Sequence, residues 1–170
     1  MVMKSVLSLI LIAFIFISCS SKKTDEELFN EAKTNTEEEK IPEAVVSYEE
    51  LLKEYPDSKA APEALTNLAS IYQNKLVKNI SETESLVEAA KLFRQIYDDY
   101  PESQFAPMGL FMSGFVLANE LNMYNEATET YNLFMETFSD HELAASAKEE
   151  LDNMGLTPEE ILRKNIAKGE

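Results

Sequence analysis

The chain has 170 residues, 31 of them acidic and 15 basic, which gives a formal net charge of −16 at pH 7. It is 45% hydrophobic with only four glycines, a composition typical of one soluble helical domain and unlike that of a disordered chain. The negative charge argues against nucleic acid and anionic lipid headgroups as direct ligands, because like charges repel.

Residues 1–18 have the layout of a secretory signal peptide. Lys4 supplies a short positive region, and residues 6–17 are apolar except for Ser8. This apolar core is shorter than the roughly 20 residues that a helix needs to span a bilayer. We therefore expect a signal peptide here. An uncleaved membrane anchor is an alternative.

The signal ends at Cys19, the single cysteine of the chain. The stretch Phe16-Ile17-Ser18-Cys19 resembles a bacterial lipoprotein lipobox, with a small residue directly before the cysteine. The resemblance implies that Cys19 becomes the first mature residue and carries a covalent lipid, and we expect no other cofactor. Residues 19–24 then form a lipidated tether that keeps the folded part within about 20 Å of the membrane. Plain cleavage that leaves Cys19 unmodified is the alternative.

A linker motif occurs twice further along the chain and once more in degraded form. Its copies are Tyr55-Pro56-Asp57-Ser58 with Ala61-Pro62, Tyr100-Pro101-Glu102-Ser103 with Ala106-Pro107, and Phe138-Ser139-Asp140 with Ala144. Proline after the aromatic residue ends a helix, and we expect the serine to cap the next one. The later proline is tolerated in a first helical turn. A repeated stop and restart predicts a repeated helical unit.

From Asp25 onward, apolar residues recur at spacings of three and four, which indicates helices. Small residues let paired helices approach, and aromatic residues fill the space between pairs. The spacing of these residues resembles the helix-pair pattern of tetratricopeptide (TPR) repeats. The predicted packing residues are the small Ala32, Ala44, Ala69, Ala89, Gly114 and Ala127, and the aromatic Tyr48, Tyr72, Phe93 and Tyr131.

The predicted fold class is therefore all-α, a TPR-type helix-pair solenoid. We expect about three repeats within residues 25–139, with boundaries at about 25–57, 58–101 and 102–139. Residues 140–170 are predicted to form C-terminal capping helices that cover the open end of the solenoid. The extra residues within 73–88 are interpreted as a tolerated surface insertion.

Residues for catalysis are scarce. With one histidine, His141, and one cysteine, the chain has no second ligand of these types for a Cys–His pair or a multi-histidine metal site. His141 is interpreted as a cap or turn residue. The glycines are isolated, and no carboxylate spacing matches a calcium loop. We therefore predict no enzyme, no metal site and no small-molecule substrate.

The first helix of each pair lines the concave face in TPR proteins. Carried over by position, the resemblance selects Thr66, Ser70 and Gln73 in the second repeat, and Met108, Phe111 and Phe115 in the third. The third set is apolar, and contiguous apolar surface often marks a partner site. We expect it to dock a protein segment. The alternative is that the C-terminal helices cover it.

A lipobox followed by TPRs with this linker motif resembles the BamD family of outer-membrane assembly lipoproteins. It also resembles the TPR part of the Tol-Pal-associated CpoB proteins. The first resemblance implies a periplasm-facing adaptor, lipid-anchored at the outer membrane, that binds envelope proteins and serves outer membrane protein assembly. A CpoB-like coordinator of peptidoglycan machinery and a self-associating structural envelope protein are the alternatives.

Overall fold

The computed structural model describes residues 22–168, so the predicted signal peptide and Cys19 lie outside the described residues. Within this range the chain forms helices and no strand. The helices are α1 (Asp25–Glu37), α2 (Ile41–Glu54), α3 (Ala61–Gln73), α4 (Glu82–Asp99), α5 (Ala106–Phe115), the π-helical turn η1 (Val116–Glu120), α6 (Tyr124–Thr137), α7 (Ala144–Asn153) and α8 (Pro158–Lys168). None of the described helices combines the length and the apolar character of a membrane span.

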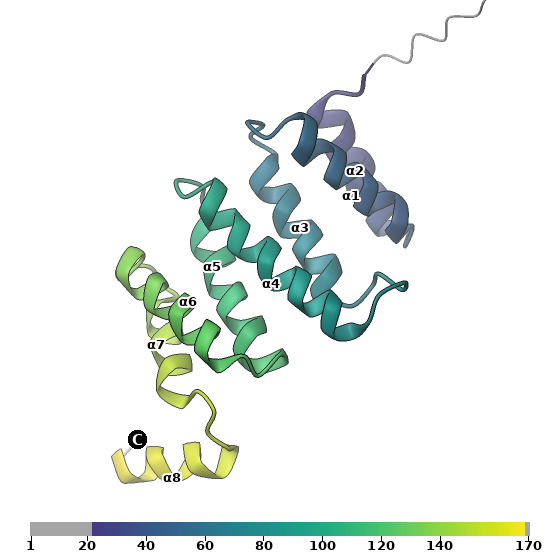
Figure 1. Cartoon of the computed structure of the whole chain (residues 1–170). Helices are drawn as coiled ribbons and strands as arrows, with labels where there is room; N and C mark the ends of the chain where they lie inside the picture. The colour runs from purple at the N-terminus through teal and green to yellow at the C-terminus, as the bar shows by residue number, and fades with distance from the viewer. Residues whose placement is uncertain (1–21, 169–170) are drawn as a thin grey trace, which may run out of the picture.

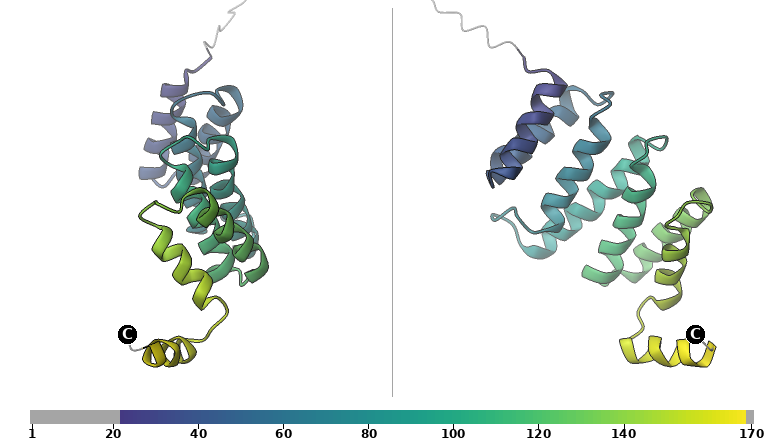
Figure 2. Two further views of the ribbon diagram at one scale, coloured as in Figure 1. Left: turned by 90° about the vertical axis from the view of Figure 1, so that its left-hand side faces the viewer. Right: turned by 180° about the vertical axis from the view of Figure 1, so that it is seen from behind.

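The helices form successive pairs that stack into a solenoid (Figure 1). Each of α1 to α6 packs mainly against the helices before and after it. α4 and α6 face the viewer in Figure 1, whereas α1, α3, α5 and α7 face the viewer from behind, in the right panel of Figure 2. The predicted fold class, a TPR-type helix-pair solenoid, is confirmed.

Two hydrophobic clusters form the core, and most of the predicted packing residues lie in them. Tyr48, Phe93 and Tyr131 are buried, while Tyr72 is only partly buried. Gly114 contacts a tyrosine, since a Cβ built on it would lie 2.9 Å from the Tyr131 ring. The remaining small residues, Ala32, Ala44, Ala69, Ala89 and Ala127, are fully buried.

The serine of the linker motif does not cap the following helix, contrary to the prediction. The residue before α3 is Ala60, and no side chain caps that end. Ser58 lies earlier, and its Oγ accepts from the Ala60 amide at 3.1 Å. The physical reason is an intervening turn, in which the Ala61 amide donates to the Ser58 carbonyl. In the second copy, Ser103 Oγ accepts likewise from the Phe105 amide at 3.2 Å.

In the first two linker motifs, the tyrosine hydroxyl donates to a backbone carbonyl that lies one helix pair earlier in the chain. The Tyr100 hydroxyl donates to the Pro56 carbonyl at 2.7 Å, which joins the second copy to the first. The Tyr55 hydroxyl donates to the Lys23 carbonyl at 2.6 Å. Phe138 has no hydroxyl, and its ring packs edge-on against Tyr97 at a centroid distance of 5.8 Å. The degraded copy therefore keeps the packing and loses the hydrogen bond.

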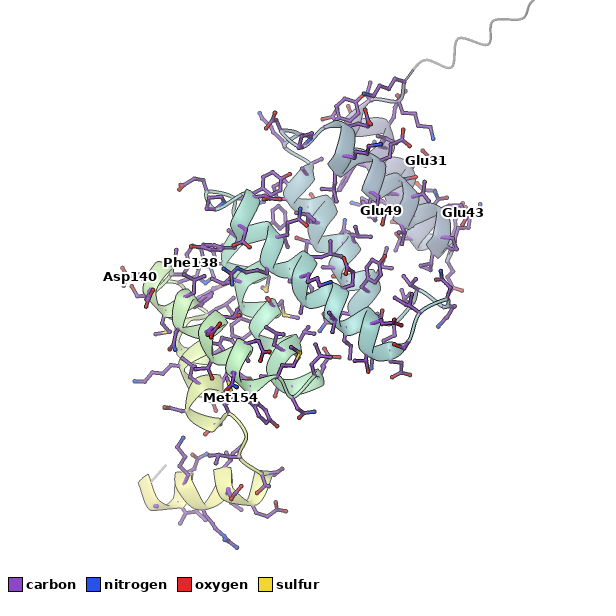
Figure 3. The ribbon with its side chains drawn as sticks, viewed as in Figure 1. Glu31, Glu43, Glu49, Phe138, Asp140 and Met154 are labelled. Carbon is purple, nitrogen blue, oxygen red and sulfur yellow. The ribbon has the colours of Figure 1, made fainter. Side chains whose placement is uncertain are left out.

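Phe138 and Asp140, labelled in Figure 3, lie after the end of α6, and His141 follows them in the chain before α7 begins. Its Nδ1 accepts from the Leu143 amide at 3.2 Å. The imidazole thus makes the contact that the serine hydroxyl makes in the other two copies, and His141 is a turn residue as predicted.

The C-terminal helices cover the solenoid only in part. α7 packs on α6 and buries Ala144 and Ala147. α8 begins with a capping box, because the Thr157 amide donates to the Glu160 carboxylate and the Glu160 amide donates to the Thr157 hydroxyl. However, α8 extends away from the solenoid of α1 to α7 in Figures 1 and 2, and its Leu162 and Ile166 are 61% and 67% exposed. The expectation that α8 caps the end is therefore wrong.

Candidate partner-binding face

We define the first-helix face as the surface formed by α1, α3, α5 with η1, and α7. Polar contacts join successive helices across this face. They are the ion pair between Lys33 and Glu63 at 4.0 Å, the bond from Gln73 Nε2 to Glu120 Oε1 at 2.8 Å, and the bond from Asn119 Nδ2 to Glu150 Oε2 at 3.0 Å. The face is therefore a continuous surface held together along the solenoid.

The π-helical turn η1 makes two of these contacts possible. Asn119 and Glu120 are adjacent in the chain, yet Glu120 contacts α3 and Asn119 contacts α7. The wider turn ends with the Leu121 amide donating to the Val116 carbonyl five residues earlier. Neighbouring side chains thus bind the helices on both sides. The π-turn could not be predicted from the sequence, since no composition signal separates it from an α-helix.

In the second repeat, the predicted face residues are half-buried and already hydrogen-bonded. Thr66 Oγ1 donates to the Pro62 carbonyl at 2.9 Å, and Ser70 Oγ donates to the Thr66 carbonyl at 2.8 Å. Gln73 is held by Glu120. The two hydroxyls therefore return to their own helix, and the Gln73 amide joins α3 to η1.

In the third repeat, the structure separates the three predicted apolar residues. Phe111 packs inward, with ring centroids 5.6 Å from Tyr131 and 6.1 Å from Phe134. Met108 is 44% exposed, and Phe115 is half-buried. Neither Met108 nor Phe115 belongs to the packing shell of either core cluster. The two lie seven residues apart on α5 and so project from one side of it.

Phe111 is therefore a core residue as well as a face position. It shares its cluster with Ala144 and Ala147 of α7. α7 thus contributes to the cluster that partly buries Phe111, whereas Met108 remains open to solvent. The rings packed on Phe111 belong to α6, so it is not the C-terminal helices that bury its ring. We call Met108 and Phe115 the α5 patch.

Two clefts open along the first-helix face. One, of about 230 Å³, lies between α1 and α3 and includes Lys33 and Asn67 in its lining. The other, of about 270 Å³, lies beside η1, α7 and the start of α8, and includes Glu149 and Glu150. Among residues 22–168, no three His, Cys, Asp or Glu side chains are placed to hold a metal ion.

Equivalent tyrosines of α2 and α6 differ in their surroundings. Burial raises the pKa of Tyr48, and hydrogen bonds with Asn67 and Thr36 oppose this rise. Burial, with the Glu150 charge as a second cause, raises the pKa of Tyr131 well above its usual range. The Tyr131 hydroxyl is buried without a hydrogen-bond partner in the described part of the chain. The desolvation cost of this hydroxyl is therefore not offset by a hydrogen bond within the described residues.

The chain's N-terminal part matches a known family. The tetratricopeptide repeat family model matches residues 28–58, which extend from α1 through α2 to the first linker motif. No curated protein matches the chain. Residues 28–58 therefore form a TPR unit, and the helix pairs that follow continue the solenoid. Because TPR solenoids are in general scaffolds for protein–protein interaction, the first-helix face is the candidate surface for a protein partner.

Proposed function

We propose that the protein is a lipid-anchored adaptor that faces the periplasm at the outer membrane and binds segments of envelope proteins. The α5 patch is the observation that carries the proposal. Met108 and Phe115 are apolar side chains on the first-helix face that do not pack on either core cluster. An apolar surface of this kind is where a partner segment gains most from leaving water.

The geometry defines the kind of segment that fits. Met108 and Phe115 are separated by two helical turns, about 10 Å along α5. A partner with two apolar side chains at that separation would cover both residues. Methionine adapts its shape to the partner, and the phenylalanine ring supplies most of the contact area. The mainly polar cleft beside η1 and α7 on the same face would receive polar groups that flank the segment.

The cellular context of the proposal rests on the lipobox-like stretch that ends at Cys19 and on the linker motif. Together they resemble BamD-type lipoproteins, so we propose a role in outer membrane protein assembly. A short tether would keep the first-helix face near the membrane, where such partners emerge. Two or more acyl chains are needed for stable anchoring, as lipoprotein processing at Cys19 would provide.

Two experiments test the proposal separately. Full-length protein and a Cys19→Ala variant are expressed with a palmitate analogue. Label on the first and none on the second is expected, and an unlabelled wild-type protein would refute the anchor. For partner binding, in-cell crosslinking is followed by identification of captured proteins.

The matched variants for capture are Met108→Glu with Phe115→Glu, and Val46→Glu as control. Val46 is 60% exposed on α2, so its substitution adds one charge of the same sign to an apolar surface residue of a second helix. We expect the double variant to lose the partners and the control to keep them. Equal capture by all forms would contradict binding at the α5 patch. Captured β-barrel assembly components support the BamD-like role, whereas captured cell-wall synthases support the coordinator role instead.

A further inference from the structure

The apolar side of α8 has no partner within the described residues. Leu162 and Ile166 are one turn apart on the exposed side of this helix, flanked by exposed Glu159 and Arg163. Ile161 contributes instead to the cleft beside α7. An exposed pair of aliphatic side chains next to one acid and one base is a specific surface, which we call the α8 stripe.

α7 offers no surface that would receive the α8 stripe. The side of α7 that does not pack on α6 is formed mainly by polar residues, and its exposed members are Ala145, Ser146, Lys148, Glu149 and Asp152. α8 is fixed instead by the Lys164 ammonium, which contacts the Asp152 carbonyl and the Asn153 side chain at the end of α7. These contacts leave the stripe directed away from the body. Closure of α8 onto its own pair helix would bury it against polar groups.

The inserted loop of the second repeat makes an apolar groove at the other end of the molecule. The loop of residues 74–81 replaces the three-residue turns that join α1 to α2 and η1 to α6. It places Leu76 and Val77 opposite Ile41 and Val45 of α2, which together line a cleft of about 510 Å³. The side chains lining this groove are predominantly apolar. The insertion therefore has a structural consequence that a neutral surface loop would not have.

The groove and the α8 stripe are complementary in charge as well as in apolar character. Glu39 and Lys78 line the groove, one acid and one base. The stripe carries Arg163 and Glu159 beside its aliphatic pair. Arg163 facing Glu39, with Glu159 facing Lys78, would pair both sets of charges across the contact. A purely lipid surface would satisfy the aliphatic pair but not Glu159.

We propose that the α8 stripe of one copy docks in the groove between α2 and the 74–81 loop of a second copy. Figure 1 places α8 at the opposite end of the solenoid from α1 and α2, so the α8 stripe cannot reach the groove of its own copy unless the stacking of the helix pairs is disrupted. The contact is head-to-tail, and repetition of such a contact builds an open row unless the rotation closes it. One short helix buries less area than a standard interface, so the association is weak in dilute solution. The inference does not require the lipid anchor.

The test uses two differently tagged full-length copies in the same cell. One copy carries a photo-crosslinking residue at position 162, and the control carries it at exposed position 132 on α6. A product of two copies is expected from position 162 and not from position 132. Peptide mapping should locate the crosslink within residues 39–45 or 72–79 of the other copy. Crosslinks only to lipid, only to another protein or elsewhere on the second copy would overturn the proposal.

A charge exchange checks the pairing without relying on the aliphatic residues. Arg163→Glu in the crosslinking copy should lower the yield about tenfold, because it sets two acids opposite each other. Glu39→Lys in the other copy should then restore it. Glu39 has a φ of 58°, and lysine has the same conformational cost as glutamate in this left-handed region, so the substitution keeps the turn. A yield that stays low with both changes would refute the pairing of residues 163 and 39.

Discussion

Gly109 marks the place where α5 comes closest to α4. A Cβ built there would lie 2.7 Å from the Phe93 carbonyl oxygen and 2.8 Å from the Ile96 Cβ. Helix propensity favours alanine over glycine by about 0.8–1.0 kcal/mol. Overpacking costs about 1–3 kcal/mol, and the upper part applies because a backbone carbonyl cannot turn aside. We therefore predict that Gly109→Ala lowers the free energy of unfolding by about 1–2 kcal/mol.

Urea denaturation followed by circular dichroism measures this change. Ala145→Gly is the calibration, since Ala145 is exposed on α7 and its substitution reports helix propensity in this chain. It should lower stability by less than about 1 kcal/mol, because Ala145 lies in the first turn of α7 and the full glycine penalty applies to a helix interior. If Gly109→Ala instead raises stability by the amount that Ala145→Gly loses, α4 and α5 do not approach as closely as described. The position matters for function, because Gly109 lets α5, the helix that carries the α5 patch, pack closely on α4.

Three further substitutions test contacts at single atoms. Tyr131→Phe should raise the free energy of unfolding by about 1 kcal/mol, because it removes a buried hydroxyl without a partner, and a loss in denaturation would show that the hydroxyl is bonded. Tyr100→Phe should lower it by about 0.5–1 kcal/mol through loss of the bond to the Pro56 carbonyl, and an unchanged midpoint would contradict that bond. Ser58→Ala should raise the pKa of Asp25 in an NMR titration, because the Ser58 hydroxyl, donating at 2.6 Å, holds that pKa below its usual value. Because the pKa of Asp25 is lower in the folded than in the unfolded state, the ionised carboxylate stabilises the fold at a pH above its unfolded pKa. This stabilisation is lost as the pH falls through the folded pKa, so wild type and Ser58→Ala should converge in stability in acid.

The solenoid was predictable because its cause is local and periodic. Pairs such as Ala44 and Tyr48 on α2 recur as Ala89 with Phe93 and Ala127 with Tyr131, and close helix packing requires that spacing. The start of α8 was predictable for a similar reason, since Thr157 and Glu160 form hydrogen bonds to each other within one helical turn. Patterns of this kind need no knowledge of distant neighbours.

The rest depends on neighbours that a periodic pattern does not identify. Position in the repeat placed Phe111 on an open face, but aromatic residues of α6 lie near enough to pack on it. The amphipathic pattern of α8 predicts an apolar side without saying what covers it. Ser58 has the side chain of a cap, yet the turn after it moves the helix start to Ala61. Gly109 is a partial exception, since a glycine within a helical pattern is costly in the sequence itself, but only the structure shows which helix approaches it.

The accessibility of residue 115 in cells tests most directly whether a partner occupies the first-helix face. Full-length Phe115→Cys and Val46→Cys are each labelled with a maleimide in cells and after purification, and wild-type protein reports any reaction at Cys19. Phe115→Cys should react several-fold more slowly in cells than when purified, while Val46→Cys should react alike in both. Equal rates for Phe115→Cys in the two conditions would contradict the account.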